Sequence, residues 1–383
     1  GVPAIGASNC APACRNLPVA NLLVTGGAGF IGANFVHYWR ARHPGDSITV
    51  LDALTYAGNR ANLAGANAVG FVEADIRDQG TVETLLREQN IDTLVHFAAE
   101  SHVDRSIHGP DAFIDTNVLG THSLLKAART VWLGETRKPH RFHHVSTDEV
   151  YGSLGADDPA FSEITPYAPN SPYSASKAAS DHLVRAYHHT YGLDVTTSNC
   201  SNNYGPYQFP EKLIPLFLIN ALHGRSLPIY GDGMNVRDWL HVEDHCRGIE
   251  LVIQKGRVGE TYCIGGGEEL ANLTVIDTLC AAVDAAFAGD ASLKARYPNA
   301  PAAQGKPTDS LKTWVKDRPG HDRRYAIDER KIRDELGYVP ARDFATGFAA
   351  TLRWYIDNEP WWQAILDGSY RDWVATNYGD RAG

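Results

Sequence analysis

The stretch T-G-G-A-G-F-I-G, from Thr25 to Gly32, directly follows the apolar run LLVT at 22–25. Its glycines satisfy both G-x-x-G-x-x-G and G-x-G-x-x-G, and a helical pattern begins near Phe30. A tight turn from strand to helix needs residues that tolerate unusual φ angles. Backbone N–H groups without a Cβ in the way can approach a pyrophosphate at the positive end of a helix. The stretch therefore predicts the first strand–turn–helix unit of a dinucleotide-binding fold.

Short apolar or β-branched runs alternate with longer helical patterns through the first 200 residues. The runs lie at 22–25, 48–52, 70–75, 93–99, 142–147 and 194–199. This alternation is typical of βαβ units, and nearly continuous apolar runs belong to parallel strands that are buried on both faces. We expect an α/β protein whose residues 21–200 form a Rossmann-like, doubly wound parallel sheet that binds NAD.

The sequence changes character after Asn199, where segments such as NNYGPY and LPIYGDG are punctuated by Pro and Gly. Residues 201–383 are expected to form mainly a smaller, mixed substrate-binding domain built from loops and shorter helices, with some segments returning to the first domain. The stretch 288–312 is interpreted as a variable surface excursion. Residues 1–20 lack the features of a secretion signal and are expected to be a disordered extension.

Charge and composition exclude several classes of partner. The chain of 383 residues has 35 Lys and Arg against 45 Asp and Glu, a net charge of −10, which disfavours nucleic acid and anionic membranes. No uninterrupted apolar run approaches the ~18 residues of a membrane span. Six cysteines are too few for a disulfide scaffold, so a reducing cytoplasm is expected.

Two spacings resemble metal-ligand pairs, but neither predicts a metal site. Cys10 and Cys14 lie in the first twenty residues, and His241 and His245 share a predicted helix. Neither pair has a third ligand nearby in the sequence, and the histidines lack the H-E-x-x-H order. We predict no metal.

The ends of the second and third strands carry acids. Asp52 lies twenty residues after Gly32, where a carboxylate accepts both ribose hydroxyls of an adenosine and repels a 2′-phosphate. This position favours NAD over NADP. Asp75 follows the third run, where it would meet the adenine amino group, although a helix-capping Asp is an equal alternative.

Tyr173 and Lys177 lie in S-P-Y-S-A-S-K, in a helix expected to open at Pro172 and to run to about Tyr191. Their spacing of four places both side chains on one face. Tyr173 would be a general base if the ammonium of Lys177 and the nicotinamide charge lowered its pKa by about three units, which takes ~4 kcal/mol. A solvated Tyr–Lys pair is the alternative, because this spacing is common in helices.

The strand before this helix ends in S-T-D-E-V-Y-G, Ser146 to Gly152. With this motif the chain resembles the extended short-chain dehydrogenase/reductase family, and within it the dTDP-glucose 4,6-dehydratases. The resemblance extends from Leu22 to the Trp-rich end. It is carried by TGGAGFIG, LDALTYAGN, AAESHVDRS, HHVSTDEVYG, YSASK, CSNNYGPYQFPEKLIP, PIYGDG, NVRDWLHVEDH and DRPGHDRRYAID.

The resemblance implies conversion of dTDP-glucose to dTDP-4-keto-6-deoxyglucose and water, as in rhamnose-type deoxysugar biosynthesis. Glu149 would take the C5 proton, and a protonated Asp148 would donate to the departing C6 hydroxyl. Thr147 would bind the 4-oxygen, Tyr173 and Lys177 would complete the catalytic set, and tightly bound NAD would be regenerated in each turnover. Two adjacent acids at a strand end are otherwise a helix cap or a solvated turn.

Motif and resemblance together predict two sets of binding residues. The cofactor set is Gly26, Gly29, Phe30, Ile31, Gly32, Asp52, Ala53, Leu54, Thr55, Asp75, Ile76, Ala98, Ala99, Thr116, Tyr173, Lys177 and Asn203. The substrate set is Ser101, His102, Thr147, Asn203, Glu211, Lys212, Leu213, Pro228, Ile229, Tyr230, Arg237, Asn272, Arg318 and His321. Simple ion pairing with Asp238 or Asp317 is the alternative for the two arginines.

Several alternatives stay open at this point. UDP-glucose is the nearest rival substrate, because neither STDEVYG nor YSASK contacts the base. A sugar-nucleotide epimerase or decarboxylase has no use for both Asp148 and Glu149, and a non-catalytic NAD sensor would lose Tyr173 or Lys177. The resemblance also implies a homodimer with a four-helix interface formed by the segments 111–133 and 174–191. The tryptophans at 354, 361 and 362 are interpreted as packing residues rather than a sugar platform.

Overall fold

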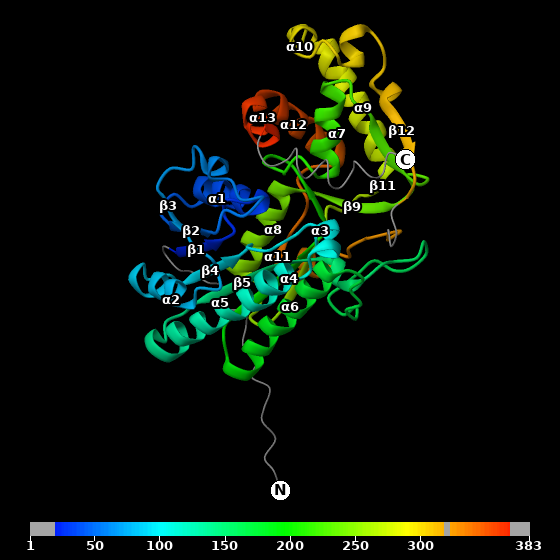
Figure 1. The fold of residues 1–383 in the computed structure, drawn as a ribbon. Coiled ribbons are helices and arrows are strands. Elements are labelled where there is room, and N and C mark those ends of the chain that lie inside the picture. Colours follow the sequence, from blue (N-terminus) through cyan, green and yellow to red (C-terminus); the bar gives the residue numbers. More distant parts are fainter. Residues whose placement is uncertain (1–19, 318–321, 368–383) are drawn as a thin grey trace.

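A seven-stranded parallel sheet forms the centre of the molecule, with the strand order β10-β6-β5-β4-β1-β2-β3 (Figure 1). The computed structural model describes residues 20–317 and 322–367. The strands are β1 (Asn21–Thr25), β2 (Ser47–Asp52), β3 (Val69–Glu73), β4 (Thr93–His96), β5 (Arg141–Thr147), β6 (Val195–Cys200) and β10 (Thr261–Ile264). All six strands expected from the first 200 residues are confirmed, and the Rossmann-like fold with them.

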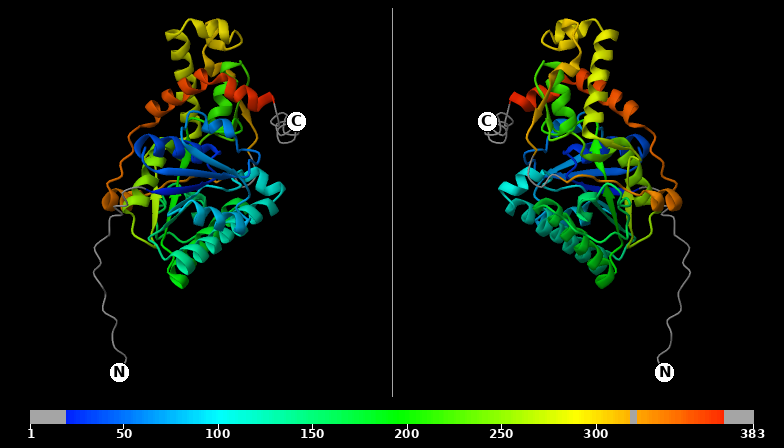
Figure 2. Two further views of the ribbon diagram at one scale, coloured as in Figure 1. Left: turned by 90° about the vertical axis from the view of Figure 1, so that its left-hand side faces the viewer. Right: turned by 90° about the vertical axis from the view of Figure 1, so that its right-hand side faces the viewer.

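Helices cover both faces of this sheet. One face carries α1 (Phe30–Arg42), α8 (Val242–Lys255) and α11 (Arg330–Leu336), whose apolar side chains share one buried cluster with β1, β2 and β10. The other face carries α2 (Gln79–Glu88), α5 (Thr121–Ala128) and α6 (Pro172–Tyr191). Figures 1 and 2 show α5 and α6 side by side on this second face. The sheet is therefore buried on both sides, as its apolar runs require.

The remaining elements of this domain lie close to its carboxyl edge or extend α5. They are η1 (Arg60–Leu63), α3 (Val103–His108), α4 (Asp111–Phe113), the π-helical turns η2 (Ile114–Gly120) and η3 (Arg129–Thr136), and the 3-10 turn η4 (Asp148–Tyr151). The predicted segment 111–133 is thus one nearly continuous helical rod, made of α4, η2, α5 and η3.

Helix α6 has the bounds that its sequence predicts. Ser171 is the N-cap, and its side chain and that of Ser174 form a reciprocal capping box, with Pro172 in the first turn. The helix ends at Gly192, whose φ of 76° is the left-handed conformation that terminates helices. Both ends are therefore fixed by local sequence.

The second half of the chain builds a smaller domain. Its strands form a three-stranded sheet, β7 (Asn202–Tyr204), β9 (Val236–His241) and β11 (Glu269–Ala271), and a parallel pair, β8 (Leu227–Tyr230) and β12 (Lys312–Val315). Its helices are α7 (Leu213–Leu222), α9 (Asn272–Gly289), α10 (Ser292–Arg296), α12 (Phe344–Asp357) and α13 (Glu359–Asp367), with the turns η5 (Pro301–Gln304) and η6 (Thr308–Leu311). Strand β10 and helices α8 and α11 also come from this half but join the first domain.

Two expectations about this half are wrong. The domain is dominated by helices rather than loops, because α7, α9 and α12 bury their apolar faces in one cluster. Within the supposed surface excursion at 288–312, Leu293, Tyr297 and Ala300 are fully or almost fully buried in that cluster. The polar composition of the stretch hid these regularly placed apolar anchors.

Helix α9 is long and apolar enough to cross a membrane by length and composition. However, it carries Asp277 and Asp284, which bind Lys312 and Thr308 of the neighbouring segment. Its apolar side chains, including Val275, pack against α7 and α12. Its contacts in the structure are those of a core helix.

The terminal aromatics pack, as predicted. Trp362 is fully buried and donates its indole N–H to the Tyr355 carbonyl, while Trp361 donates to Asn62 of the first domain. The expected extension at 1–20 lies outside the described residues apart from Ala20, as do Cys10 and Cys14.

Candidate active site

A cleft opens at the carboxyl ends of β1 and β4, where the chain order of the sheet reverses direction, the usual place for a ligand in a doubly wound sheet. It has two lobes, with cavity volumes of about 330 Å³ and about 240 Å³. The lobes share six lining residues: Glu149, Asn202, Asn203, Gln208, Glu211 and Lys212. One continuous site therefore extends from the segment that joins β1 to the first turn of α1, which contains Gly26, Gly29 and Gly32 and is called the glycine turn below, into the second domain.

The glycine turn has no side chain at Gly26 or Gly32 that would keep a ligand in the first lobe away from its backbone. Gly26 has φ +69°, and a Cβ there would lie 2.5 Å from the backbone nitrogen of Ala98. A Cβ on Gly32 would lie 2.2 Å from the Gly26 carbonyl oxygen. Because no side chain fits at either position, the amino end of α1 faces the lobe uncovered, and the residues fit a dinucleotide pyrophosphate.

Asp52 is held in place by the backbone around it. Its Oδ2 accepts the Ala28 N–H at 2.9 Å, and its Oδ1 accepts the Leu54 N–H at 2.9 Å. Burial raises the pKa of Asp52, while these two hydrogen bonds favour the carboxylate. Each oxygen keeps a further acceptor site, so the group fits the adenosine ribose diol.

Asp75 lines the same lobe and pairs with Arg77, which holds its pKa below the usual range. The helix-cap alternative is wrong for Asp75, because Asp78 caps α2 by accepting the Thr81 N–H. The adenine contact of Asp75 stays a prediction.

The carboxyl end of β5 carries the acid pair. Thr147 ends the strand, and its hydroxyl accepts the Glu149 N–H at 3.2 Å, which starts the tight turn η4. This turn sends the side chains of Asp148 and Glu149 into different surroundings. Asp148 is 2% exposed and lines only the first lobe, whereas Glu149 lines both lobes.

Burial raises the pKa of Asp148 well above its ordinary value, and the charges of Glu149 and Asp238 raise it further. Arg237 acts in the opposite direction but does not outweigh them. Asp238 is itself buried, which raises its pKa to about 7. Its surroundings therefore favour the protonated form of Asp148, the form that is able to donate a proton.

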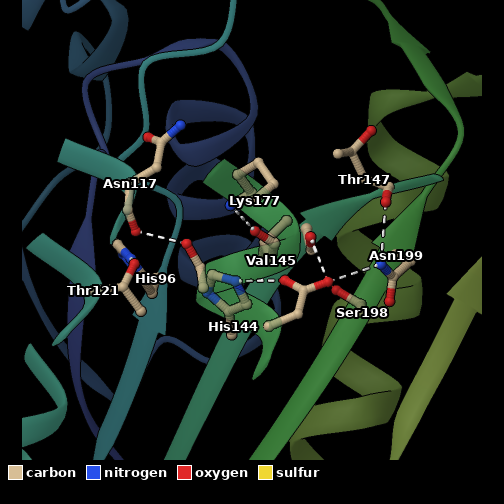
Figure 3. Close-up of polar contacts among 12 residues, drawn as sticks. His96, Asn117, Thr121, His144, Val145, Thr147, Lys177, Ser198 and Asn199 are labelled. Carbon is tan, nitrogen blue, oxygen red and sulfur yellow. Dashed lines mark hydrogen bonds and ion pairs between the residues drawn. The ribbon is translucent and has the colours of Figure 1, made fainter. Parts of the chain in front are cut away.

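The Tyr–Lys pair lies at the cleft, as its sequence position predicts. Tyr173 and Lys177 both line the cleft, but burial and then the charge of Glu149 raise the pKa of Tyr173 well above its usual value. The ammonium of Lys177 donates to the Val145 carbonyl at 2.9 Å (Figure 3). Among the protein groups alone, burial therefore determines the direction of the Tyr173 pKa. The predicted lowering depends on the nicotinamide charge as well as on Lys177, and it stays a prediction.

The second lobe is lined by groups suited to an anionic sugar compound. Arg237 is buried, lies over the Tyr325 ring at 4.4 Å and donates to the Asp322 carbonyl at 3.0 Å. Its guanidinium thus contacts neighbours other than the carboxylate of Asp238. Glu211 lies 3.6 Å from both His102 and Arg105, and burial raises its pKa.

The cleft brings together nearly all the predicted binding residues. Leu54 is an exception in the first lobe, since it contributes its backbone N–H to Asp52 instead of lining the cavity. Ile229 is an exception in the second, because alternation along β8 turns it into the apolar core while Pro228 and Tyr230 face the lobe. Arg318 and His321 lie outside the described residues.

Sequence reasoning missed several lining residues. They are Tyr56, Gly58, Glu100, Ser201, Asn202, Gln208, Phe209 and Trp239, together with others that the glycine turn and strand ends supply. Tyr56, in the loop after β2, has its ring stacked under Arg105 at 3.7 Å. For Tyr56, Glu100 and Ser201, the available signal was their position in the segments that follow β2, β4 and β6, whereas Trp239 lies inside β9.

The two histidines of the H-x-x-x-H spacing have separate structural roles. His241 caps α8 through the Glu243 N–H, and His245 pairs with the Asn203 amide oxygen at 2.9 Å. Among residues 20–317 and 322–367, no group of three or more His, Cys, Asp or Glu could hold a metal ion.

The doubly wound sheet, its glycine turn, the acid at the end of β2 and the Tyr–Lys helix beside the cleft define an extended short-chain dehydrogenase/reductase. The chain belongs to the family described as GDP-mannose 4,6 dehydratase, whose model matches residues 23–351. This family and the dehydratase relatives below confirm the resemblance found in the sequence.

Two curated relatives are dTDP-glucose 4,6-dehydratases. That of Xanthomonas campestris is 57% identical over 359 residues, covering 92% of this chain and 98% of the relative. That of Salmonella typhimurium is 48% identical, covering 94% and 99%. A crystal structure of dTDP-glucose 4,6-dehydratase from Streptomyces venezuelae with NAD and TYD bound is 50% identical, with a TM-score of 0.79, and covers 90% of this chain and 99% of that one.

Proposed function

We propose that this chain is an NAD-dependent dTDP-glucose 4,6-dehydratase that forms dTDP-4-keto-6-deoxyglucose and water. The observation that carries the proposal is the acid pair at the end of β5, a buried Asp148, whose pKa is raised, beside a Glu149 that lines both lobes. The extent of similarity to enzymes of that name, 57% and 48% over more than nine-tenths of the chain, supports it.

The first lobe would hold NAD through the backbone of the glycine turn and through Asp52. Bound there, NAD would supply the acceptor for the C4 hydride of the sugar and the store from which that hydride returns to C6. Asp52 favours NAD over NADP because its carboxylate, fixed by two backbone N–H groups, would repel a 2′-phosphate.

Tyr173 and Thr147 act on the 4-hydroxyl of the sugar. Thr147 donates a hydrogen bond to the 4-oxygen, and Tyr173 receives the proton of that hydroxyl as C4 is oxidised. Because burial raises the pKa of Tyr173, this transfer needs positive charge close to the phenol when the site is filled. Lys177, one turn along α6, and the nicotinamide ring supply it.

The acid pair performs the elimination. A ketone at C4 makes the C5 proton acidic, so Glu149 can remove it as a general base. Asp148 donates its proton to the C6 hydroxyl, which leaves as water. The two roles require carboxyls in opposite protonation states, and the different burial of these neighbours supplies the difference.

Arg237 and Lys212 in the second lobe would bind the diphosphate and nucleotide, with Pro228, Tyr230 and Asn272 near the base.

The proposed function is tested by incubating the purified protein in parallel with dTDP-glucose, UDP-glucose and GDP-mannose and comparing kcat/KM for the 4-keto-6-deoxy product. We expect the highest value with dTDP-glucose. A preference for another nucleotide would reassign the substrate, and no product from any of them would refute a 4,6-dehydratase.

The quaternary state belongs to the same proposal. The rod 111–136 and α6 lie side by side, and Ile107, Ile114 and Leu119 on or beside the rod are between 47% and 59% exposed. These exposed apolar side chains suit a homodimer with a four-helix interface, which sedimentation would test. The buried thiols of Cys200, Cys246, Cys263 and Cys280 suit a reducing cytoplasm.

A further inference from the structure

Helix α6 places a third polar side chain in line with Tyr173 and Lys177. Asp181 follows Lys177 by the same spacing of four, so the three residues share one face of the helix. Asp181 is 5% exposed and is absent from the lining of both lobes. It lies behind the cleft, where the mechanism above assigns it no role.

Four donors converge on this carboxylate. Its Oδ1 accepts from His144 Nε2 at 3.0 Å. Its Oδ2 accepts from the Ser146 hydroxyl at 3.0 Å, the Tyr167 hydroxyl at 2.8 Å and the Asn199 amide at 3.2 Å. Figure 3 shows the contacts of His144 and Asn199 from β5 and β6. The anion is therefore bonded to β5, β6 and the loop before α6.

The network continues to the catalytic end of β5. The Asn199 amide that binds Asp181 also donates to the Thr147 carbonyl at 3.1 Å, and Lys177 donates to the Val145 carbonyl at 2.9 Å (Figure 3). Asp181 is thus connected, through one residue, to the backbone that carries Thr147 and the acid pair.

Lys177 is the one charged partner of Asp181 among the titratable groups described next. Burial shifts the pKa of every other titratable group facing the pair toward its neutral form: His144 and His96 downward, and Tyr167, Tyr151 and Cys200 upward. Burial alone would raise the pKa of Asp181, but His144 and the charge of Lys177 bring it below its usual value. Burial lowers the pKa of Lys177, and Asp181 is the first group that opposes it.

We propose that Asp181 is a positioning residue of the dehydratase reaction, the buried counter-ion that keeps Lys177 charged and holds the end of β5 for catalysis. The proposal rests on the function proposed above. Asp181 touches neither sugar nor cofactor, and acts through Lys177 on Tyr173 and through Asn199 on Thr147.

The test is Asp181→Asn, which keeps the size of the side chain but removes its charge. Because a nearby opposite charge shifts a pKa by about 1–3 units, loss of the anion should lower the pKa of Lys177, so the ammonium that must stabilise the Tyr173 phenolate is lost at a lower pH. The falling limb of the kcat–pH profile, on which Lys177 deprotonates, should therefore move down by at least about one pH unit. The KM for dTDP-glucose should change little, since Asp181 lines neither lobe.

Tyr167→Phe is the matched control. It removes one hydrogen bond from the same carboxylate oxygen but leaves the charge, so the falling limb should stay where it is in the wild type. A wild-type limb in Asp181→Asn would overturn the proposal. Equal shifts in both variants would also overturn it, because they would assign the effect to packing rather than charge.

The double variant Lys177→Met/Asp181→Asn covers a failure to fold. If Asp181→Asn is unfolded and the double variant is folded, as judged by circular dichroism and thermal melting, the anion is needed for the ammonium and the proposal stands. If both are unfolded, Asp181 is structural only and the proposal fails. Wild-type protein without 4,6-dehydratase activity would instead refute the proposed function, which keeps the two failures distinguishable.

Discussion

Replacing Asp148 with Asn should stabilise the protein while it removes the acid. A buried carboxyl whose pKa is raised well above its ordinary value of 3.8 destabilises the folded protein relative to the unfolded chain, by about 1.4 kcal/mol for each pKa unit of the shift. Asparagine has nearly the same shape and no charge to suppress. Because Asp148 is 2% exposed, most of this cost is borne by the folded protein and is relieved in the variant.

The sign of the pH dependence follows from the raised pKa. Above pH ~3.8 the unfolded chain releases the Asp148 proton while the folded protein keeps it, so wild-type stability falls as pH rises toward the folded pKa. The free energy of unfolding of Asp148→Asn minus that of the wild type should therefore grow between about pH 5.5 and about pH 8, by up to about 1.4 kcal/mol for each pH unit below the folded pKa. Urea denaturation at both pH values measures it.

Asp78→Asn is the control, since Asp78 is an exposed cap of α2 whose pKa is lowered and which is ionised across this range. Its difference from the wild type should not change with pH. A difference for Asp148→Asn that is equally constant would mean that Asp148 is ionised in the folded protein and is not the acid. In activity, Asp148→Asn should be slow on dTDP-glucose but spare a 6-fluoro sugar, whose leaving group needs no proton.

Three further predictions concern single residues. Glu149→Gln should still oxidise C4 but eliminate ~10²- to 10⁴-fold more slowly, so that product deuterated at C5 forms correspondingly more slowly in D₂O; formation at the wild-type rate would exclude Glu149 as the base. Tyr173→Phe should form no 4-keto intermediate, because no base remains for the 4-hydroxyl; near-normal turnover would remove Tyr173 from the mechanism. Gly26→Ala should purify without dinucleotide, because its Cβ would lie 2.5 Å from the Ala98 nitrogen at a φ of +69°. Stoichiometric NAD in the denatured supernatant would contradict that reading of the turn.

The first half of the fold was predictable because its signals are local. Buried parallel strands require apolar runs, and α6 carries its own capping box and terminal glycine. The second half was misjudged because α7, α9 and α12 bury apolar faces against one another. Such mutual burial depends on contacts between segments far apart in the chain, which composition does not report.

For the candidate site, too, one part could be predicted from the sequence and another could not. Residues that follow strand ends, such as Gly26, Asp52 and Thr147, could be placed because parallel strands end at one edge of the sheet. The directions of the charged side chains and of the pKa shifts could not be predicted from the sequence. The direction of the Lys177 ammonium and the pKa of Tyr173 depend on Val145 and on burial, neither of which the spacing of four contains.

The acid pair shows how two neighbours on the chain acquire opposite roles. Thr147 ends β5 in extended conformation, and its hydroxyl accepts the Glu149 N–H, so the chain turns within the next two residues. This turn buries Asp148 beside Asp238, where ionisation is costly, and points Glu149 at the junction of the two lobes. An acid that must give a proton and a base that must take one are thereby distinguished mainly by burial, to which the charges of Glu149 and Asp238 add. The same burial that makes Asp148 an acid raises the pKa of Tyr173, so the site functions only if buried positive charge is supplied at Lys177, and Asp181 lies one turn further along α6 to sustain it.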